Sequence, residues 1–149
     1  MAPPEFVRAQ PEHVEILLDS VRAYYAFDGI RFEPGSVRRA ILQLLGTPAL
    51  GEAWLIRDQG AVVGHFVVTF GFDLEFGGRQ AILTELYLIE RARGRGFGSA
   101  VLGFVEERLS AMGIRTLEVQ AEDDNTEARR FYARAGFVAE TRIPFTKRW

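Results

Sequence analysis

Apolar residues in the first part of the chain recur every three to four positions, which predicts two amphipathic helices. The first pattern follows Pro11 and ends near Asp28-Gly29, and the second follows Pro34-Gly35 and stops around Gly46-Thr47-Pro48. Proline is tolerated in the first turn of a helix, and glycine is typical just after its end. A short apolar segment from Phe6 to Ala9 precedes both helices and predicts a first strand.

The middle of the chain has the apolar runs and turn residues of β-structure. Trp54 to Arg57 and Ala61 to Phe70 flank the turn Asp58-Gln59-Gly60, so we expect an antiparallel hairpin. Residues 71–80 contain three glycines and two acids, which predicts a loop. Ala81 to Ile89 is another apolar run and predicts a central strand.

The last part of the chain alternates helical and extended patterns. We expect a helix over roughly Gly96 to Met112, a strand from Ile114 to Val119, a short helix from Asn125 through Ala135, and a last strand that includes Ile143 to Thr146. The unit from Ala81 to Val119 predicts a right-handed parallel crossover, whereas the earlier strands are joined by short turns. The sequence therefore predicts one α/β domain over residues 1–149 with a mixed sheet.

Composition narrows the class of protein. The 149 residues are 48% hydrophobic and 26% charged, as in a globular domain. The absence of cysteine excludes disulfides, thiolate metal sites and cysteine nucleophiles, and fits a cytoplasmic location. We expect neither an export signal nor a membrane span, because no basic stretch precedes an apolar run at the N-terminus and no apolar run is long enough. A formal net charge of −2 argues against non-specific nucleic-acid binding.

Three arginines and three glycines fall together in the segment Arg91 to Gly98, between a predicted strand and a predicted helix. Without the glycines, this run of arginines would be typical of a solvated surface. However, a helix that starts after glycines leaves its first backbone N–H groups unpaired, and its positive end favours a phosphate. The glycines remove Cβ atoms that would hold a pyrophosphate away from the backbone, and Arg93 and Arg95 can add charged hydrogen bonds. The segment therefore predicts an anion site.

Other readings of the glycine segment are weaker. A P-loop requires a lysine before the serine, and here Phe97-Gly98 precedes Ser99. A dinucleotide fold requires an acid about twenty residues further on, which Glu118 could supply, but the spacing is G-x-G-x-G and the strand-helix alternation does not continue after Val119. A glycine-rich helix start without a ligand stays open.

Two motifs in the second half of the chain together resemble the GNAT superfamily of N-acetyltransferases. The segment Arg93 to Gly98 matches the family pattern Arg/Gln-x-x-Gly-x-Gly/Ala, and Glu85-Leu86-Tyr87-Leu88 resembles the family's fourth strand. The second motif follows the predicted fifth strand and consists of Asn125, Ala128, Phe131-Tyr132 and Gly136-Phe137. The motifs cover roughly residues 80 to 138, and the N-terminal half agrees in element order only.

The resemblance implies a GNAT-like fold with a mixed, mostly antiparallel sheet of six to seven strands, flanked by helices, in which strands 4 and 5 splay apart. Acetyl-CoA would lie in that gap. The implied acetyl-CoA contacts are Tyr87, Leu88 and Ile89 along the pantetheine arm, Arg93, Gly94, Arg95, Gly96, Phe97, Gly98 and Ser99 around the pyrophosphate, Asn125 and Ala128 on the second motif, and Tyr132 near the sulfur.

Acetyl transfer to an amine requires a neutral nitrogen, although a lysine-like amine is almost wholly protonated at neutral pH. Glu85 is the carboxylate on the strand that would border the thioester, since the preceding residue is Thr84, and it is the candidate base. A structural carboxylate is the alternative. Tyr132 is the candidate proton donor to the CoA thiolate. We expect direct attack without an acyl-enzyme. A zinc site is not expected either, because the chain has only two histidines.

The acceptor cleft is expected from the segments that resemble the family least. Tyr24, Phe27, Asp28 and Phe32, with Asp73 and Glu75, would form an aromatic and acidic mouth for a cationic amine of a small molecule, amino acid or peptide. The same aromatics could instead be core and the acids solvated. An acyl-CoA sensor without turnover is the main alternative function. A protein whose main role is assembly is another, since the last strand and exposed apolar surface could pair two copies.

Overall fold

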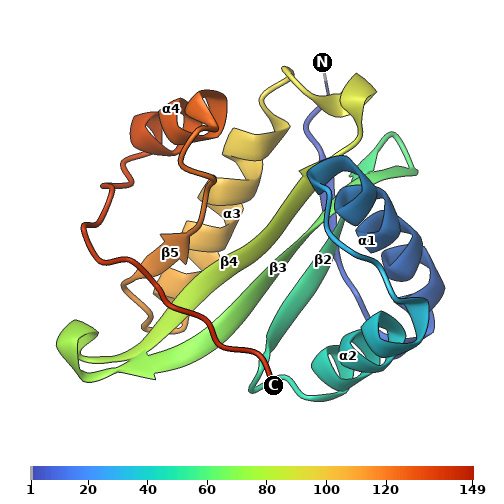
Figure 1. Cartoon of the computed structure of the whole chain (residues 1–149). Coiled ribbons are helices and arrows are strands. Elements are labelled where there is room, and N and C mark those ends of the chain that lie inside the picture. Colours follow the sequence, from blue (N-terminus) through green and yellow to red (C-terminus); the bar gives the residue numbers. More distant parts are fainter. Residues whose placement is uncertain (1) are drawn as a thin grey trace.

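Within residues 2–149, which the computed structural model describes, the strands form one five-stranded sheet in the order β1-β2-β3-β4-β5 (Figure 1). The first four strands pair antiparallel, and β4 pairs parallel with β5. This confirms the mixed sheet and the parallel crossover. The bounds are β1 Glu5–Arg8, β2 Gly51–Asp58, β3 Ala61–Asp73, β4 Gly78–Leu88 and β5 Leu117–Val119.

The helices begin and end close to the residues that the sequence predicts. Glu33 accepts hydrogen bonds from the N–H groups of Gly35 and Ser36 and so caps the second helix, while Gly29, with a φ of 69°, ends the first. None of the helices described has the length and apolar character to span a membrane. The bounds are α1 Val14–Asp28, α2 Pro34–Gly46, α3 Phe97–Ala111 and α4 Thr126–Arg134, with 3-10 turns at η1 Pro11–His13, η2 Leu74–Phe76 and η3 Glu90–Ala92.

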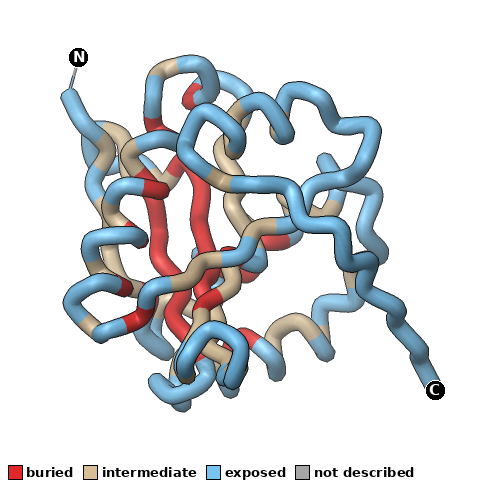
Figure 2. Tube along the Cα trace, turned by 90° about the vertical axis from the view of Figure 1, so that its left-hand side faces the viewer, coloured by how far each residue is buried: buried red, intermediate tan, exposed pale blue. Residues whose placement is uncertain are grey.

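The buried residues of the described chain form two clusters, one on each face of the sheet. On one face Leu17 and Ile41 of α1 and α2 pack with Leu55 of β2. On the other, Val101 of α3 packs with Phe66 of β3, and the aromatic residues of α4 lie against the same cluster. Figure 2 shows the buried residues along the central strands. The sheet is thus a middle layer whose two faces are covered by different helix pairs.

A bulge in β4 decides which face its polar residue occupies. Val67 and Val68 are adjacent in β3 but oppose Glu85 and Leu83, so Thr84 is an extra residue on β4. Because side chains alternate along a strand, Leu83 and Glu85 would otherwise share a face. Instead Leu83 is buried in the cluster under α3, whereas Glu85 contacts Tyr25 of α1. The bulge therefore turns a carboxylate toward α1.

The parallel contact between β4 and β5 is short. Three described register pairs join Ala81–Leu83 to Leu117–Val119. Beyond Leu83, β4 continues to Leu88 with β3 as its described strand neighbour and no β5 residue opposite. The second half of β4 is thus unpaired on its β5 side, as splayed strands require.

One loop prediction and one strand prediction are wrong. The expected loop at residues 71–80 is instead the end of a long hairpin, in which β3 reaches Asp73 and β4 begins at Gly78. The last strand at Ile143 to Thr146 is absent, and residues 138–149 are exposed (Figure 2). Pro144 lacks the N–H that a ladder needs, and the segment has no described strand partner. The described sheet therefore has five strands rather than six to seven. The pairing of two copies stays a prediction.

A buried carboxylate joins three elements on the α3 side. The side chain of Glu52 in β2 is 6% exposed and accepts two hydrogen bonds from Arg108 of α3, at 2.5 and 2.6 Å, and one from Trp54 Nε1 at 3.1 Å. Arg8 of β1 lies 3.5 Å away. Burial raises the pKa of Glu52, but the hydrogen bonds from Arg108 and Trp54 and the positive charges of Arg108 and Arg8 outweigh it, so the pKa lies below its ordinary value.

Replacing Glu52 by glutamine should lower the free energy of unfolding by roughly 1–3 kcal/mol near pH 7, because Arg108 and Arg8 lose their anionic partner. A carboxyl whose pKa is lowered by folding stabilises above its ordinary pKa and loses this effect as the pH falls through the folded value. The difference between wild type and Glu52→Gln should therefore shrink from about pH 7 to about pH 3 in urea unfolding. Glu106→Gln, at an exposed position of α3, is the control. A difference that does not depend on pH would contradict this account.

Candidate active site

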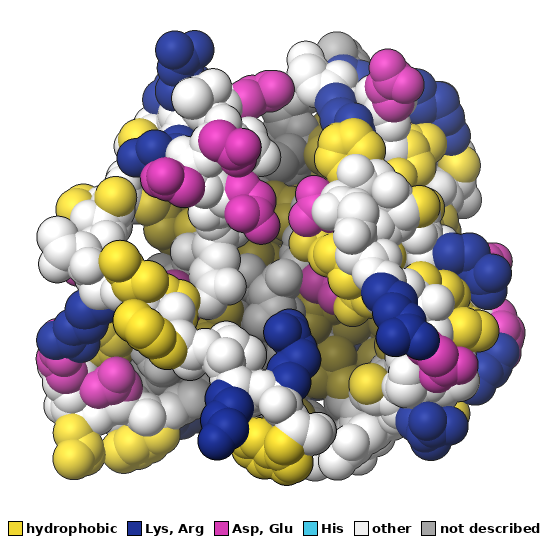
Figure 3. Space-filling model, in the orientation of Figure 1, with side chains coloured by type: hydrophobic (Ala, Val, Ile, Leu, Met, Phe, Trp, Pro, Cys, Tyr) yellow, Lys and Arg dark blue, Asp and Glu magenta, His cyan; other side chains and the backbone are white. Residues whose placement is uncertain are grey.

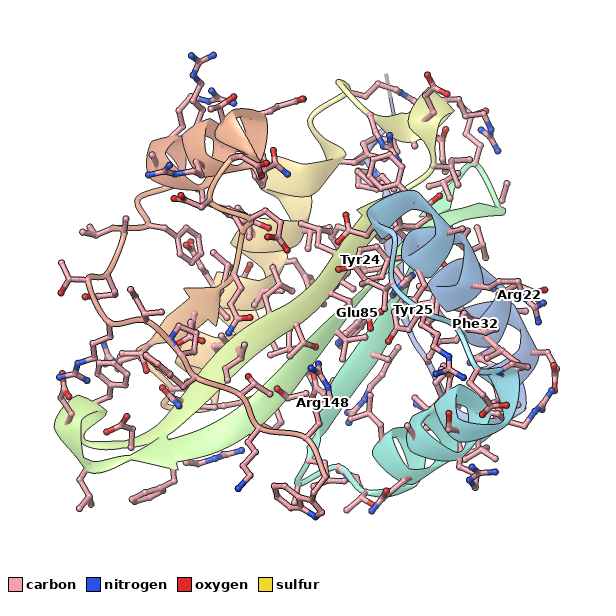
Figure 4. All side chains as sticks on the ribbon, in the orientation of Figure 1. Arg22, Tyr24, Tyr25, Phe32, Glu85 and Arg148 are labelled. Atoms are coloured by element: carbon pink, nitrogen blue, oxygen red, sulfur yellow. The ribbon has the colours of Figure 1, made fainter. Side chains whose placement is uncertain are left out.

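Glu85 is the centre of a chain of polar contacts between the sheet and α1. Its Oε1 lies 2.7 Å from Nε2 of His65 on β3, and its Oε2 accepts a hydrogen bond from the Tyr25 hydroxyl at 3.2 Å. Nδ1 of His65 lies 2.6 Å from Oγ of Ser20 on α1. Figure 4 shows Glu85 of β4 beside Tyr24 and Tyr25 of α1. The carboxylate is thus held from two elements.

His65 has its polar atoms satisfied although its side chain is wholly buried. With the proton on Nε2, the ring donates a hydrogen bond to Glu85, and its Nδ1 accepts a hydrogen bond from the Ser20 hydroxyl. This arrangement fixes one carboxylate oxygen of Glu85, and Tyr25 fixes the other. The Glu85 side chain keeps 17% of its surface exposed, so a ligand can still reach it.

Aromatic rings enclose the carboxylate. Tyr24 lies over His65 and Tyr87, with ring centroids 6.0 and 5.8 Å away. Burial raises the pKa of Tyr24 to about 12, helped by the negative charges of Asp28 and Glu85. Burial also raises the pKa of Tyr25 to about 12, with the Glu85 charge and hydrogen bond adding to it. Both phenols therefore stay protonated at neutral pH and can donate hydrogen bonds.

A cavity of about 340 Å³ opens next to Glu85, between α1, α2 and the sheet. Leu17 and Val21 of α1 line one side and Ile41 of α2 the other, while Glu85 lies at the sheet. The space-filling view shows this face of the molecule hollowed between the α4 side and the α1 side (Figure 3). An apolar chamber with a carboxylate at its edge can hold a small cationic group.

The glycine segment forms an open turn at the start of α3. Gly94 and Gly96 have φ values of 71° and 80°, which favour glycine, and a Cβ at either position would meet no atom within 4 Å. Gly96 is the N-cap of α3 and provides no side-chain hydrogen bond, so the first N–H groups of the helix are left for another acceptor. This geometry fits an anion such as a pyrophosphate.

Two arginines of the same segment, Arg93 and Arg95, are engaged with the protein. Arg93 Nε donates to the Leu88 carbonyl at 2.8 Å, and its guanidinium lies 4.2 Å from the ring centroid of Phe27. Arg95 pairs with Asp58 at 2.8 Å. Arg93 thus occupies a carbonyl in the stretch where the family resemblance implies the pantetheine arm, and the N–H of Ile89 donates to the Val63 carbonyl. The anion site rests first on backbone N–H groups and the helix end.

The second motif packs directly against the first. A Cβ on Gly98 would lie 3.1 Å from the Phe131 ring, so glycine there lets α3 and α4 approach closely. Asn125 caps α4, because its Oδ1 accepts the Ala128 N–H at 3.0 Å. Tyr132 packs between Phe131 and Phe137, and burial raises its pKa. Its negative charge when ionised also contributes to the raised pKa of Tyr24, so the two phenols lie within electrostatic reach.

The expected acceptor residues are only partly brought together. Tyr24 lies next to Glu85, Phe32 packs on Tyr25, and Phe27 lies at the end of α1 under Arg93. The exposed Asp28 adds negative charge near Tyr24. By contrast, Asp73 and Glu75 lie at the tip of the β3-β4 hairpin, where Asp73 caps η2 and Glu75 pairs with Arg142 at 2.8 Å. Residues 78–84 of β4 separate that tip from Glu85.

Sequence reasoning missed Ser20 and His65. The available signal was a histidine inside an apolar strand, which a buried site must pair with a polar partner. Its partners lie 20 and 45 residues away in sequence, so the pattern could not identify them. In the described part of the chain no three His, Asp or Glu side chains are placed to hold a metal ion.

Comparison with known proteins gives consistent matches. The model of the acetyltransferase (GNAT) family matches residues 17–137. An uncharacterised N-acetyltransferase of Mycobacterium tuberculosis is 28% identical over 127 residues, which is 85% of this chain and 69% of that protein. The aminoalkylphosphonate N-acetyltransferase of Salmonella typhimurium is 30% identical over 88 residues, covering 59% of this chain and 56% of that protein. An integron cassette protein from the mobile metagenome of Cole Harbour Salt Marsh superposes with a TM-score of 0.85 and 30% identity, covering 96% of this chain and 89% of that chain.

Proposed function

This chain belongs to the GNAT family and is an acetyl-CoA-dependent N-acetyltransferase, and we propose that it acetylates a primary amine held between Glu85 and the open side of β4. The observation that carries the proposal is the position of the Glu85 carboxylate. It is fixed by His65 and Tyr25, still partly exposed, and adjacent to the half of β4 that has no β5 residue opposite.

The donor side fits acetyl-CoA. The open turn at Gly94 and Gly96 and the uncapped start of α3 offer backbone N–H groups to a pyrophosphate. The pantetheine arm would run past Tyr87 and Leu88 at the end of β4 to Ile89, and Arg93 would have to release the Leu88 carbonyl for the arm to pair with it. Asn125 uses its carbonyl oxygen as a cap, which leaves its amide N–H₂ to donate. Acetyl-CoA supplies an activated acyl carbon and a thiolate leaving group.

Glu85 acts as the base in this proposal. An amine with a lysine-like pKa of about 10.4 must lose a proton before it attacks, at a free-energy cost of roughly 4–5 kcal/mol at neutral pH. Glu85 attracts the ammonium and accepts its proton, while His65 and Tyr25 hold the two carboxylate oxygens in place. A base so positioned contributes typically a hundredfold to ten-thousandfold.

In this proposal Tyr132 donates a proton to the leaving group, the CoA thiolate. The bond between the amine nitrogen and the acetyl carbon forms as the bond between that carbon and sulfur breaks, and the thiolate then takes a proton. Because burial raises its pKa, the Tyr132 phenol is protonated at neutral pH and able to donate. Its electrostatic interaction with Tyr24 of α1 supports a position on the α4 side, within reach of the groups that react beside Tyr24.

The donor assignment is tested by Gly96→Asp, which should weaken CoA binding at least tenfold, because a carboxylate at the start of α3 repels the pyrophosphate. Gly113→Asp is the matched control. Gly113 follows the other end of α3, has a φ of 75°, and likewise has nothing within 4 Å of a Cβ. Isothermal titration with CoA should show weaker binding for the first variant and near wild-type binding for the second. Equal affinity of both variants would refute the assignment.

The catalytic assignment is tested by Glu85→Gln and Tyr132→Phe. Each should lower kcat at least a hundredfold while changing the Kd for CoA less than about threefold, because neither change touches the anion site. Release of CoA thiol in the presence of a panel of primary amines measures turnover. The exposed Glu106→Gln serves as the control. Wild-type protein that binds CoA but releases no thiol with any amine would support a sensor instead.

A further inference from the structure

The cavity beside Glu85 is lined mainly by apolar side chains, and one of its described lining residues is charged. Its walls are aliphatic side chains from α1, α2 and β3, and they include Val21, Val37, Leu44 and Val67. The described polar lining residues are Tyr25 and Ser36, together with Glu85, which is the charged one. An occupant therefore meets one anionic end and a largely apolar chamber.

We propose that this cavity is the acceptor pocket and that it selects a small primary amine with an uncharged apolar body. The proposal rests on the proposed function and adds the class of acceptor. The amino group lies at Glu85, and the hydrocarbon part extends between α1 and α2 toward Ile41 and Leu44.

Charge complementarity disfavours acceptors that carry a second charge. A carboxylate or phosphonate inside the cavity would lie among aliphatic side chains, and the described lining residues offer it no cation. Two arginines of α1 and α2 are directed elsewhere, because Arg38 pairs with Glu15 and Arg22 lies over the Phe32 ring. A second ammonium group would likewise be buried without a described lining carboxylate other than Glu85.

Size disfavours large acceptors. A volume of about 340 Å³ is at the lower end of the range for small-molecule pockets, roughly 300–1,000 Å³. Such a pocket encloses an amine with one short hydrocarbon group, whereas an aminoglycoside or a folded protein terminus would remain mostly outside. Each methylene that enters the cavity should raise kcat/KM for the amine about fourfold, until the cavity is filled.

Arg148, a cation outside the cavity, provides an alternative basis for acceptor selection. Arg148 belongs to the exposed C-terminal segment, and Figure 4 shows this segment passing in front of the sheet. If Arg148 held an acceptor carboxylate at the mouth, amino acids would be better substrates than plain amines. The test therefore includes Arg148→Ala, which should leave the order of preference among the acceptors below unchanged.

The test compares three acceptors with the same five-carbon chain: pentylamine, 5-aminopentanoate and 1,5-diaminopentane. At saturating acetyl-CoA, kcat/KM for pentylamine should exceed that for either charged analogue at least tenfold, and it should rise from ethylamine to pentylamine. Equal or better use of a charged analogue would overturn the proposal while leaving acetyl transfer itself intact. Failure to acetylate any amine would overturn the proposed function as well.

A cavity-filling variant tests the location. Ala40→Phe adds a ring to the α2 wall and should lower kcat/KM for pentylamine at least tenfold but for ethylamine less than threefold. Ala111→Phe, at an exposed position at the end of α3, is the control. Circular dichroism and CoA affinity verify folding. If Ala40→Phe, folded and able to bind CoA, affects both amines equally or neither, the cavity is not the acceptor pocket.

Discussion

The position of Glu85 depends on one irregularity in the sheet. If β4 ran through Thr84 without a bulge, the Glu85 carboxylate would share the face of Leu83, which α3 covers, and would be buried among hydrocarbon side chains. The bulge gives it a histidine and a tyrosine as partners and an opening toward a cavity. It also occurs just where pairing with β5 stops, so the Glu85 carboxylate and the open strand edge lie together.

The proposed donor and acceptor sites share a boundary formed by α1 and the glycine segment. Arg93 lies against Phe27 at the end of α1 while its Nε binds the backbone of β4. On the other side, Gly98 accommodates Phe131 and brings the two motifs into contact. The two motifs are separated in sequence, yet they lie in contact because glycine at this position permits close helix packing.

Much of the fold could be predicted because its helices are amphipathic and are bounded by glycine or proline, as at Gly29 and Pro34. The sheet was harder, since the apolar spacing at Ile143 to Thr146 resembles a strand but provides no ladder partner, and glycines in residues 71–80 resemble a loop although they continue a hairpin. The two motifs identified Glu85 and Tyr132 as candidates. The partners of Glu85 could not be found from sequence, because a bulge and contacts across 20 to 60 residues bring them together.

The central claim is that an amine meets the thioester at Glu85, inside the cleft under α1. A crystal structure of the protein with CoA and pentylamine tests it most directly. The account predicts the amine nitrogen at about 3 Å from a Glu85 carboxylate oxygen, its hydrocarbon chain between α1 and α2, and the CoA sulfur beside the Tyr132 hydroxyl. An amine bound outside this cavity, with Glu85 contacting only His65 and Tyr25, would contradict it.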